Sequence, residues 1–146
     1  MPRGHRKPGR CYVLDANALV GYFEDRTIVA DKVEQLLQSA LSRDLPLLIS
    51  AVNWGEVFYI EWKCQGESGA REAAARLNEL PIAVIPADVD RATRAATLKQ
   101  KHNLSYADAF AAELAIERAA WLVTADPEFS KLGKQLSVYA LPRHEQ

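Results

Sequence analysis

The chain has 146 residues, of which 49% are hydrophobic and 25% charged, and its formal net charge is −1. This length and apolar fraction fit one domain with its own hydrophobic core and exclude a mostly disordered chain. No run approaches the roughly 20 apolar residues that cross a bilayer, and the polar start is unlike a secretory signal, so we expect no membrane association. The two cysteines predict neither a disulfide framework nor a structural zinc site, and they favour the reducing cytoplasm.

Positive charge is concentrated at the N-terminus. Residues 1–10 contain no acidic residue and four basic ones, which are Arg3, Arg6, Lys7 and Arg10. We interpret residues 1–10 as a basic, flexible tail and residues 11–146 as the folded domain. A basic tail on an acidic body fits a polyanionic partner, and a processing or tag remnant explains it equally well.

Short apolar runs alternate with longer stretches of helical periodicity along the chain. In chain order, the pattern predicts a strand at 11–14, helices at 16–24 and 31–43, a strand at 47–50, helices at 52–64 and 68–80 separated by Gly66, a strand at 82–85, helices at 88–102 and from 105 onward, and strands at 121–124 and 136–140. This alternation predicts an α/β fold, a single three-layer α/β/α domain with a mostly parallel central sheet of about five strands.

Acidic residues fall near the predicted strand ends. Asp15 follows the first strand, Asp126 follows the fourth, and Glu56 lies in the helix after the second. Asp108 lies in the first turn of the helix that leads into the fourth strand. Ligands of open α/β sheets bind beyond the carboxyl ends of the strands, so we expect the four carboxylates to converge there.

Each of these acids also has a purely structural explanation. Asp15 is a typical helix cap, Glu56 a typical solvated helix charge and Asp126 a typical turn residue. Asp108 stands three residues after Ser105, which is the spacing of a capping box. The four structural explanations are independent of one another, whereas one shared site accounts for all four acids.

A cluster of carboxylates favours divalent-metal chemistry. The carboxylates repel one another, and a hard cation such as Mg²⁺ removes that conflict while leaving room for a phosphate oxygen of a substrate. Such an ion can polarise a scissile phosphodiester toward attack by water. Asn17, Ser50 and Thr124 stand beside the acids in the sequence and are suited to orienting them.

Four segments in this order resemble the PIN domain family, and within it the VapC-type toxin ribonucleases of prokaryotic toxin–antitoxin pairs. The segments are residues 12–19, Ser50 with Glu56, residues 104–112 and residues 122–129. The resemblance covers about residues 11–140. It implies a PIN-like fold and an endoribonuclease that depends on Mg²⁺ or Mn²⁺.

The resemblance also implies specific residue roles and partners. Asp15, Glu56, Asp108 and Asp126 correspond to the metal-binding acids, and Asn17 and Thr124 to polar residues that support the site. RNA is the implied substrate, a homodimer the implied assembly, and a small cognate antitoxin protein the implied inhibitor. Glu128 is an additional acid near Asp126 that either assists the site or lies on the surface.

A polyanionic substrate also requires cations near the acids. Within the domain the candidates are Arg71, Arg76, Arg91, Arg94, Lys99, Lys101 and His102. The aromatic run Trp54, Tyr59 and Trp62 fits base stacking, but it also fits the core or a dimer interface.

Three other functions remain open from the sequence. The first is a nuclease of the same fold that acts in RNA maturation or DNA processing without an antitoxin. The second is a phosphotransfer module in which Asp15 is the phosphorylated nucleophile. The third is a binding module without catalytic activity.

Overall fold

The computed structural model describes residues 10–143, so the predicted basic tail lies outside the described residues except for Arg10. Along the chain the elements are β1 (Tyr12–Leu14), α1 (Ala16–Phe23), α2 (Thr27–Arg43), β2 (Leu47–Ser50), α3 (Ala51–Glu79), β3 (Ile82–Ile85), α4 (Val89–His102), α5 (Tyr106–Glu117), β4 (Trp121–Thr124), the 3₁₀ segment η1 (Pro127–Gln135) and β5 (Ser137–Ala140). None of the helices in this range is long and apolar enough to cross a bilayer.

The five strands form one sheet with the order β3-β2-β1-β4-β5, and every neighbouring pair is parallel. The predicted five-stranded α/β architecture is therefore confirmed, with a sheet that is wholly rather than mostly parallel. β1 is the central strand, because Val13 is in register with Leu48 of β2 and with Leu122 of β4. All five carboxyl ends consequently lie at the same edge of the sheet.

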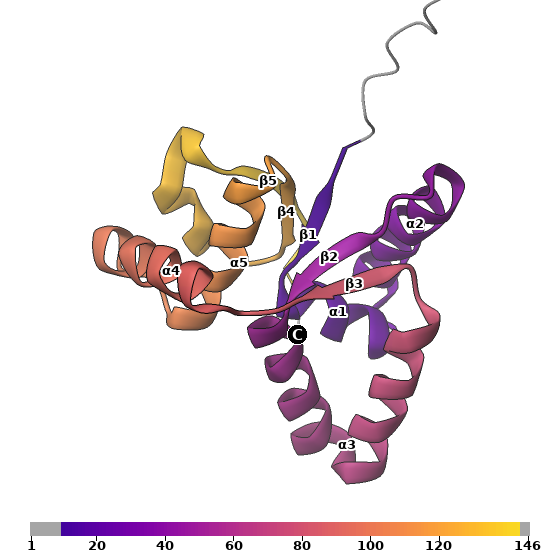
Figure 1. Cartoon of the computed structure of the whole chain (residues 1–146). Coiled ribbons are helices and arrows are strands. Elements are labelled where there is room, and N and C mark those ends of the chain that lie inside the picture. The colour runs from indigo at the N-terminus through magenta and orange to yellow at the C-terminus, as the bar shows by residue number, and fades with distance from the viewer. Residues whose placement is uncertain (1–9, 144–146) are drawn as a thin grey trace, which may run out of the picture.

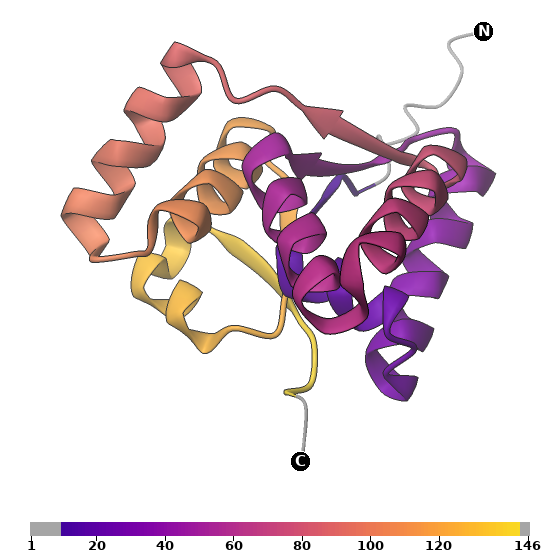
Figure 2. The same cartoon turned by 90° about the horizontal axis from the view of Figure 1, so that it is seen from below.

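Helices cover both faces of this sheet (Figures 1 and 2). Side chains of successive strand residues point to opposite faces, and β1 shows this directly. Leu14 packs into the core that contains residues of α1, α2 and α3, whereas Val13 packs into the core that contains residues of α5 and η1. Figure 1 shows α4 and α5 on one side of the sheet and α2 and α3 on the other. The result is the predicted three-layer arrangement.

The start of α2 differs from the prediction. The sequence pattern placed it at Asp31, but the helix begins at Thr27. Val29 is buried against α1 at a glycine, where a Cβ added to Gly21 would lie only 2.5 Å from Val29 Cγ1. Close packing on α1 therefore extends the helix over residues whose own pattern is too short to predict it. Asp31, at which the predicted helix began, is an exposed residue within α2.

The two predicted helices between β2 and β3 are the arms of one hairpin, α3. Gly66 separates them, because its φ of 77° and ψ of 177° are not helical. This left-handed φ favours glycine, which confirms the predicted break. The sequence pattern predicted Ser68 as the cap of the second arm, but this arm begins directly after Gly66, so Ser68 lies within it. Figure 1 shows the two arms running in opposite directions from the break.

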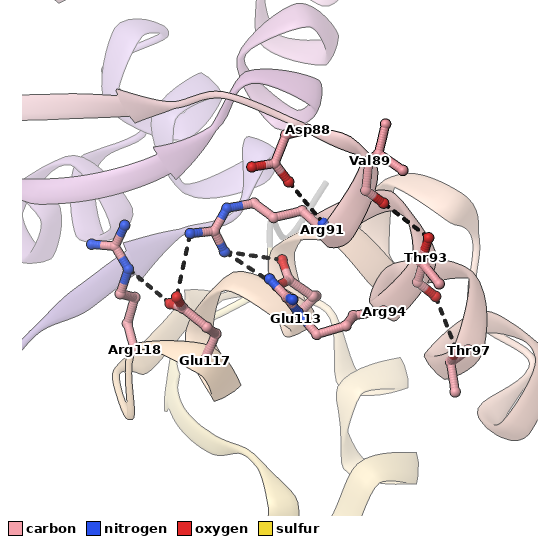
Figure 3. A network of polar contacts seen from close by, with 9 residues as sticks. All are labelled: Asp88, Val89, Arg91, Thr93, Arg94, Thr97, Glu113, Glu117 and Arg118. Carbon is pink, nitrogen blue, oxygen red and sulfur yellow. Dashed lines mark hydrogen bonds and ion pairs between the residues drawn. The ribbon is translucent and has the colours of Figure 1, made fainter.

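An ion-pair network joins α4 to α5 (Figure 3). Glu113 of α5 is 2% exposed, and its Oε1 lies 3.2 Å from Arg91 Nη1 and 2.9 Å from Arg94 Nε. Glu117 lies 3.5 Å from Arg91 and 2.8 Å from Arg118. A buried carboxylate needs such partners, because its charge is otherwise poorly solvated. The network holds α4 on α5, the helix that carries one of the predicted acids.

Candidate acidic site

Asp15 occupies the carboxyl end of the central strand. It follows β1 directly and is the N-cap of α1, where its Oδ1 accepts a hydrogen bond of 2.9 Å from the backbone N–H of Ala16. The residue is 3% exposed. The capping role predicted for Asp15 and its place at the sheet edge are therefore both present. The other carboxylate oxygen, Oδ2, is also held by hydrogen bonds.

Two polar side chains hold that second oxygen. Thr124 Oγ1, at the end of β4, donates to Asp15 Oδ2 at 2.8 Å, and Asn17 Nδ2 donates to the same oxygen at 2.9 Å. Asn17 also donates to Thr124 Oγ1 at 3.2 Å, and its Oδ1 accepts from the Ala125 backbone N–H at 3.0 Å. The network fixes the rotamer of Asp15 and joins two adjacent strands. Asn17 and Thr124 thus contact an acid directly, as expected of residues that orient it.

Three of the four predicted acids line one pocket. The pocket has a volume of about 280 Å³ and is lined by Asp15, Asn17, Glu56 and Asp108, together with Arg26 and apolar side chains. α3 supplies Glu56, and the first turn of α5 supplies Asp108, whose N–H donates to the capping hydroxyl of Ser105 at 3.1 Å. Segments that are distant in sequence therefore bring their carboxylates together at one sheet edge.

The electrostatics of this edge reflect that convergence. Burial raises the pKa of Asp15 to about 7, and the charges of Asp108 and Glu56 add to this shift, while the Thr124 hydrogen bond opposes it. Burial also raises the pKa of Asp108, with further contributions from Asp126, Glu56 and Glu128. Each of these side chains disfavours a second negative charge nearby, which is the condition that a bound cation relieves.

Asp126 lies beside this pocket and does not line it. Its backbone N–H donates to Thr124 Oγ1 at 3.0 Å, and its Oδ1 accepts from the Glu128 N–H at 2.9 Å, which caps η1. Its negative charge nevertheless contributes to the raised pKa of Asp108. The fourth predicted acid therefore belongs to the same edge, at its periphery. Glu128, the additional acid, is exposed and pairs with Lys131.

Ser50, the third predicted polar support, is buried at the end of β2. Its hydroxyl accepts a hydrogen bond of 3.2 Å from the Val52 N–H and so caps α3. Its contribution to the site is therefore made through the start of the helix that carries Glu56.

Sequence reasoning missed Asn53. This residue is fully buried, and its Nδ2 donates to Glu56 Oε1 at 3.2 Å and to the carbonyl oxygen of Ala107 at 3.1 Å. Ala107 directly precedes Asp108, so one amide connects a carboxylate on α3 to the turn that carries a carboxylate on α5. An asparagine inside an otherwise apolar helix turn, three residues before an acid, was the available signal.

Several predicted substrate-contacting cations are engaged elsewhere. Arg91 and Arg94 pair with Glu113, and Lys99 donates to the carbonyl oxygen of Leu104 at 3.0 Å. The guanidinium of Arg71 lies 5.5 Å from the ring centroid of Phe58. These residues stabilise helix packing. Arg26, which the sequence did not single out, is the arginine that lines the acidic pocket.

The donor set of this edge fits a magnesium-type ion. Within residues 10–143, no three His, Cys, Asp or Glu side chains stand close enough together to enclose an ion. Mg²⁺ does not require such a cage, because it usually binds through one or two carboxylates and retains several waters. The buried Asp15, whose pKa is raised partly by the neighbouring Asp108 and Glu56, supplies an oxygen ligand in an environment that favours added positive charge.

A model of one protein family, described as the PIN domain, matches residues 12–135 of the chain. That range contains all four acids and their polar supports. No curated protein matches the chain significantly in sequence.

Solved structures share the fold. VapBC2 from Rickettsia felis, bound to a promoter DNA fragment, is similar with a TM-score of 0.70 and 17% identity over 89% of this chain and 98% of that one. A toxin–antitoxin complex from Klebsiella pneumoniae is similar with a TM-score of 0.64 and 22% identity, over 89% of this chain and 99% of that one. VapC20 from Mycobacterium tuberculosis is described as a Sarcin-Ricin loop cleaving toxin. It is similar with a TM-score of 0.67 and 16% identity, over 84% of this chain and 95% of that one. At these identities the similarity is one of fold.

Proposed function

This chain belongs to the PIN domain family, and on that premise we propose that it is a metal-dependent endoribonuclease of the VapC type, which hydrolyses phosphodiester bonds of RNA. The observation that carries the proposal is the pocket at the carboxyl edge of the sheet. Asp15, Glu56 and Asp108 reach it from three elements, and Asp126 stands beside it. Four carboxylates at the edge where α/β sheets bind ligands support phosphodiester chemistry with a divalent ion.

In this proposal the four acids form the binding site for Mg²⁺ or Mn²⁺, with one or two carboxylates bound directly to the ion and the others bound through its waters. The bound ion supplies Lewis-acid polarisation of the scissile phosphate. Asp15 is the central ligand, because Thr124 and Asn17 fix one of its oxygens and its burial keeps the carboxylate in one position. Asn53 orients Glu56 relative to α5. Such supporting hydrogen bonds typically contribute strongly to metal affinity.

A cognate antitoxin is the proposed partner. A toxin–antitoxin complex and VapBC proteins are among the solved structures that share this fold. An acidic pocket also suits a basic inhibitory segment, because opposite charges both guide and stabilise docking. We expect the toxin and antitoxin to act in the cytoplasm, where their RNA targets are found.

We further propose a homodimer that uses the outer face of α3. Tyr59 is 64% exposed and Trp62 43% exposed on this helix, whereas Trp54 packs against the core. Exposed aromatic rings are enriched at protein interfaces. Light scattering should give a dimer mass for the wild type and a lower mass for Trp62→Asp. A monomeric wild type would exclude the dimer and leave base stacking as the role of these rings.

Cleavage of RNA by purified protein tests the nuclease proposal. Wild type with Mg²⁺ should cut RNA, EDTA should abolish the cuts, and Asp15→Asn and Asp108→Asn should be inactive. Asp90→Asn, which alters an exposed acid on α4, is the matched control and should retain activity. Full activity of either site variant would contradict the assignment of the site. Cleavage of DNA alone would favour the DNA-processing alternative.

Brief induction in a host cell tests the toxin assignment. Wild type should arrest growth and create new RNA 5′ ends, and Asp15→Asn should do neither. Coexpression of the neighbouring gene product should restore growth. Harmless overexpression of an active enzyme would instead support a role in RNA maturation without an antitoxin.

A further inference from the structure

A second pocket lies on the α1–α3 side of the molecule, outside the acidic site. It has a volume of about 420 Å³ and is lined by Phe23 and Glu24 at the end of α1 and by residues of both arms of α3, including Glu61, Glu72 and Arg76. We name it the Glu61 pocket. Its size lies within the range of pockets that bind small ligands or single side chains.

Glu61 is the unusual residue of this pocket. It is 4% exposed, and its Oε1 has no hydrogen-bond partner within residues 10–143. Burial raises the pKa of Glu61, and the charge of Glu24 adds to the shift, while Arg76 and Arg26 oppose it. A buried carboxylate oxygen without a donor is unfavourable, and most such groups in proteins have a partner. The pocket beside Glu61 is where a partner from outside the chain can bind.

The two nearby arginines are already engaged with other groups. Arg26 Nη2 lies 2.6 Å from Glu24 Oε2. The guanidinium of Arg76 lies 4.8 Å from the ring centroid of Phe23 and 5.6 Å from that of Tyr22, which is cation–π geometry. Neither arginine satisfies Glu61 Oε1. The buried Oε1 therefore lacks a donor among residues 10–143 despite the cations nearby.

The charge of the surroundings indicates a cationic ligand. A neighbouring pocket of about 430 Å³ shares Phe23 and Arg76 with the Glu61 pocket. Together the two linings contain one arginine, Arg76, and six carboxylates, which are Glu24, Glu61, Glu72, Asp25, Asp31 and Glu34. The excess of carboxylates over cations in these linings therefore favours a cationic ligand.

We propose that the Glu61 pocket binds the guanidinium group of an organic cation, which is carried either by an arginine of a protein segment or by a small free molecule. Guanidinium is more weakly hydrated than ammonium, and its planar set of donors matches carboxylate oxygens. A guanidinium group therefore loses less hydration free energy than an ammonium group when it enters a pocket with a buried acceptor. Phe23, which already packs under one guanidinium, is a suitable wall.

The Glu61 pocket is distinct from the acidic site but is connected to it through Arg26. This side chain pairs with Glu24 of the Glu61 pocket and also lines the pocket of Asp15, Glu56 and Asp108. A ligand that competes with Arg26 for Glu24 would therefore affect Arg26, which contacts both pockets. Binding itself requires neither metal nor RNA, so a failure of this inference and a failure of the nuclease proposal are measured separately.

An NMR titration of the ¹⁵N-labelled, metal-free chain tests the inference. The probes are N-acetyl-arginine-N′-methylamide, agmatine and the neutral isostere N-acetyl-citrulline-N′-methylamide. The arginine probe should shift the amide resonances of Phe23, Glu61 and Gly69 with millimolar affinity, and the citrulline probe should not. Tighter binding of agmatine than of the arginine probe would assign the site to a small free molecule, and the reverse order would assign it to a protein segment.

Two variants connect the binding to Glu61. Glu61→Gln preserves the shape and removes the charge, and it should weaken the arginine probe by about tenfold or more. Glu79→Gln changes an exposed acid at the end of the same helix and should bind as the wild type does. Dispersed amide spectra establish that both variants are folded. Equal binding of citrulline and arginine probes, or unchanged affinity in Glu61→Gln, would overturn the inference.

Discussion

Thr124 Oγ1 donates a hydrogen bond of 2.8 Å to Oδ2 of Asp15, although the two residues are 109 positions apart in the sequence. The same hydroxyl accepts hydrogen bonds from the Asn17 side chain at 3.2 Å and from the Asp126 backbone at 3.0 Å. One small side chain thus joins the ends of β1 and β4 and holds a buried carboxylate. Loss of the Thr124 hydroxyl would therefore remove three hydrogen bonds at once and leave Asp15 less firmly held.

Replacing this hydroxyl by a methyl group should therefore weaken both stability and function. Thr124→Val keeps the shape but removes the donor to Asp15, and it should lower the free energy of unfolding by about 1–3 kcal/mol. Mn²⁺ affinity should fall by about tenfold or more, as for other supporting hydrogen bonds of metal ligands. Urea unfolding and calorimetry measure the two effects. Thr124→Ser should retain most of both properties, and a Val variant equal to the wild type would refute the role of the hydroxyl.

Asp15 should make the metal-free protein less stable as the pH rises. Its pKa is raised to about 7 in the folded protein, compared with about 3.9 in an unfolded chain. Between these values the folded state binds more protons than the unfolded state, so the free energy of unfolding falls from about pH 4 to about pH 7. The total change is about 4 kcal/mol, since each pKa unit corresponds to about 1.4 kcal/mol.

Urea unfolding at pH 5 and pH 8 in the presence of EDTA measures this dependence. Asp15→Asn has no carboxylate to ionise, so it should show a shallower decline and should be more stable than the wild type at pH 8. Added Mn²⁺ should stabilise the wild type at pH 8 and should have less effect on the variant. A wild type whose stability rises over this pH range would show that the carboxylate is ionised in the fold without penalty.

Asn53 provides a test of how the acids are positioned. Asn53→Leu removes the donor shared by Glu56 and the Ala107 carbonyl, so Glu56 should lose its fixed orientation. Mn²⁺ affinity should fall by about tenfold, while circular dichroism should show an unchanged helix content. Asn78→Leu, on an exposed part of the same helix, is the matched control. Equal metal affinities of the two variants would show that Glu56 does not depend on Asn53.

The ion pairs between α4 and α5 should contribute to stability through the burial of Glu113. Arg91→Met leaves this carboxylate with Arg94 as its partner and should lower the free energy of unfolding by about 2 kcal/mol. The double variant Arg91→Met, Glu113→Leu removes the buried charge together with its partner, and it should recover most of the loss. Urea unfolding compares the two. A double variant less stable than the single one would show that Glu113 stabilises the packing of α4 on α5 even without Arg91.

The positions of most elements could be predicted because their signals are local. The apolar runs of the strands, the break at Gly66 and the capping of α5 by Ser105 depend on neighbouring residues. Their periodicity and caps follow from the geometry of strands and helices. The start of α2 was predicted wrongly because it depends on a contact between residues of two different helices. Val29 becomes helical through packing against Gly21, a contact made in the tertiary structure.

The sequence by itself determined that acids follow parallel strands, because strand ends and helix starts can be read from patterns a few residues long. The sequence also singled out Asn17 and Thr124, which hydrogen-bond to Asp15, but only the tertiary structure decided which other side chains contact the acids. Three contacts join residues from separate elements: the hydrogen bond of Asn53 to the Ala107 carbonyl, the position of Arg26 in the acidic pocket, and the ion pair of Arg91 with Glu113. Such contacts depend on how helices pack on the sheet, and the free energy of that packing is shared among many side chains, so a local pattern can suggest a candidate such as Asn53 but does not specify its partner on another element.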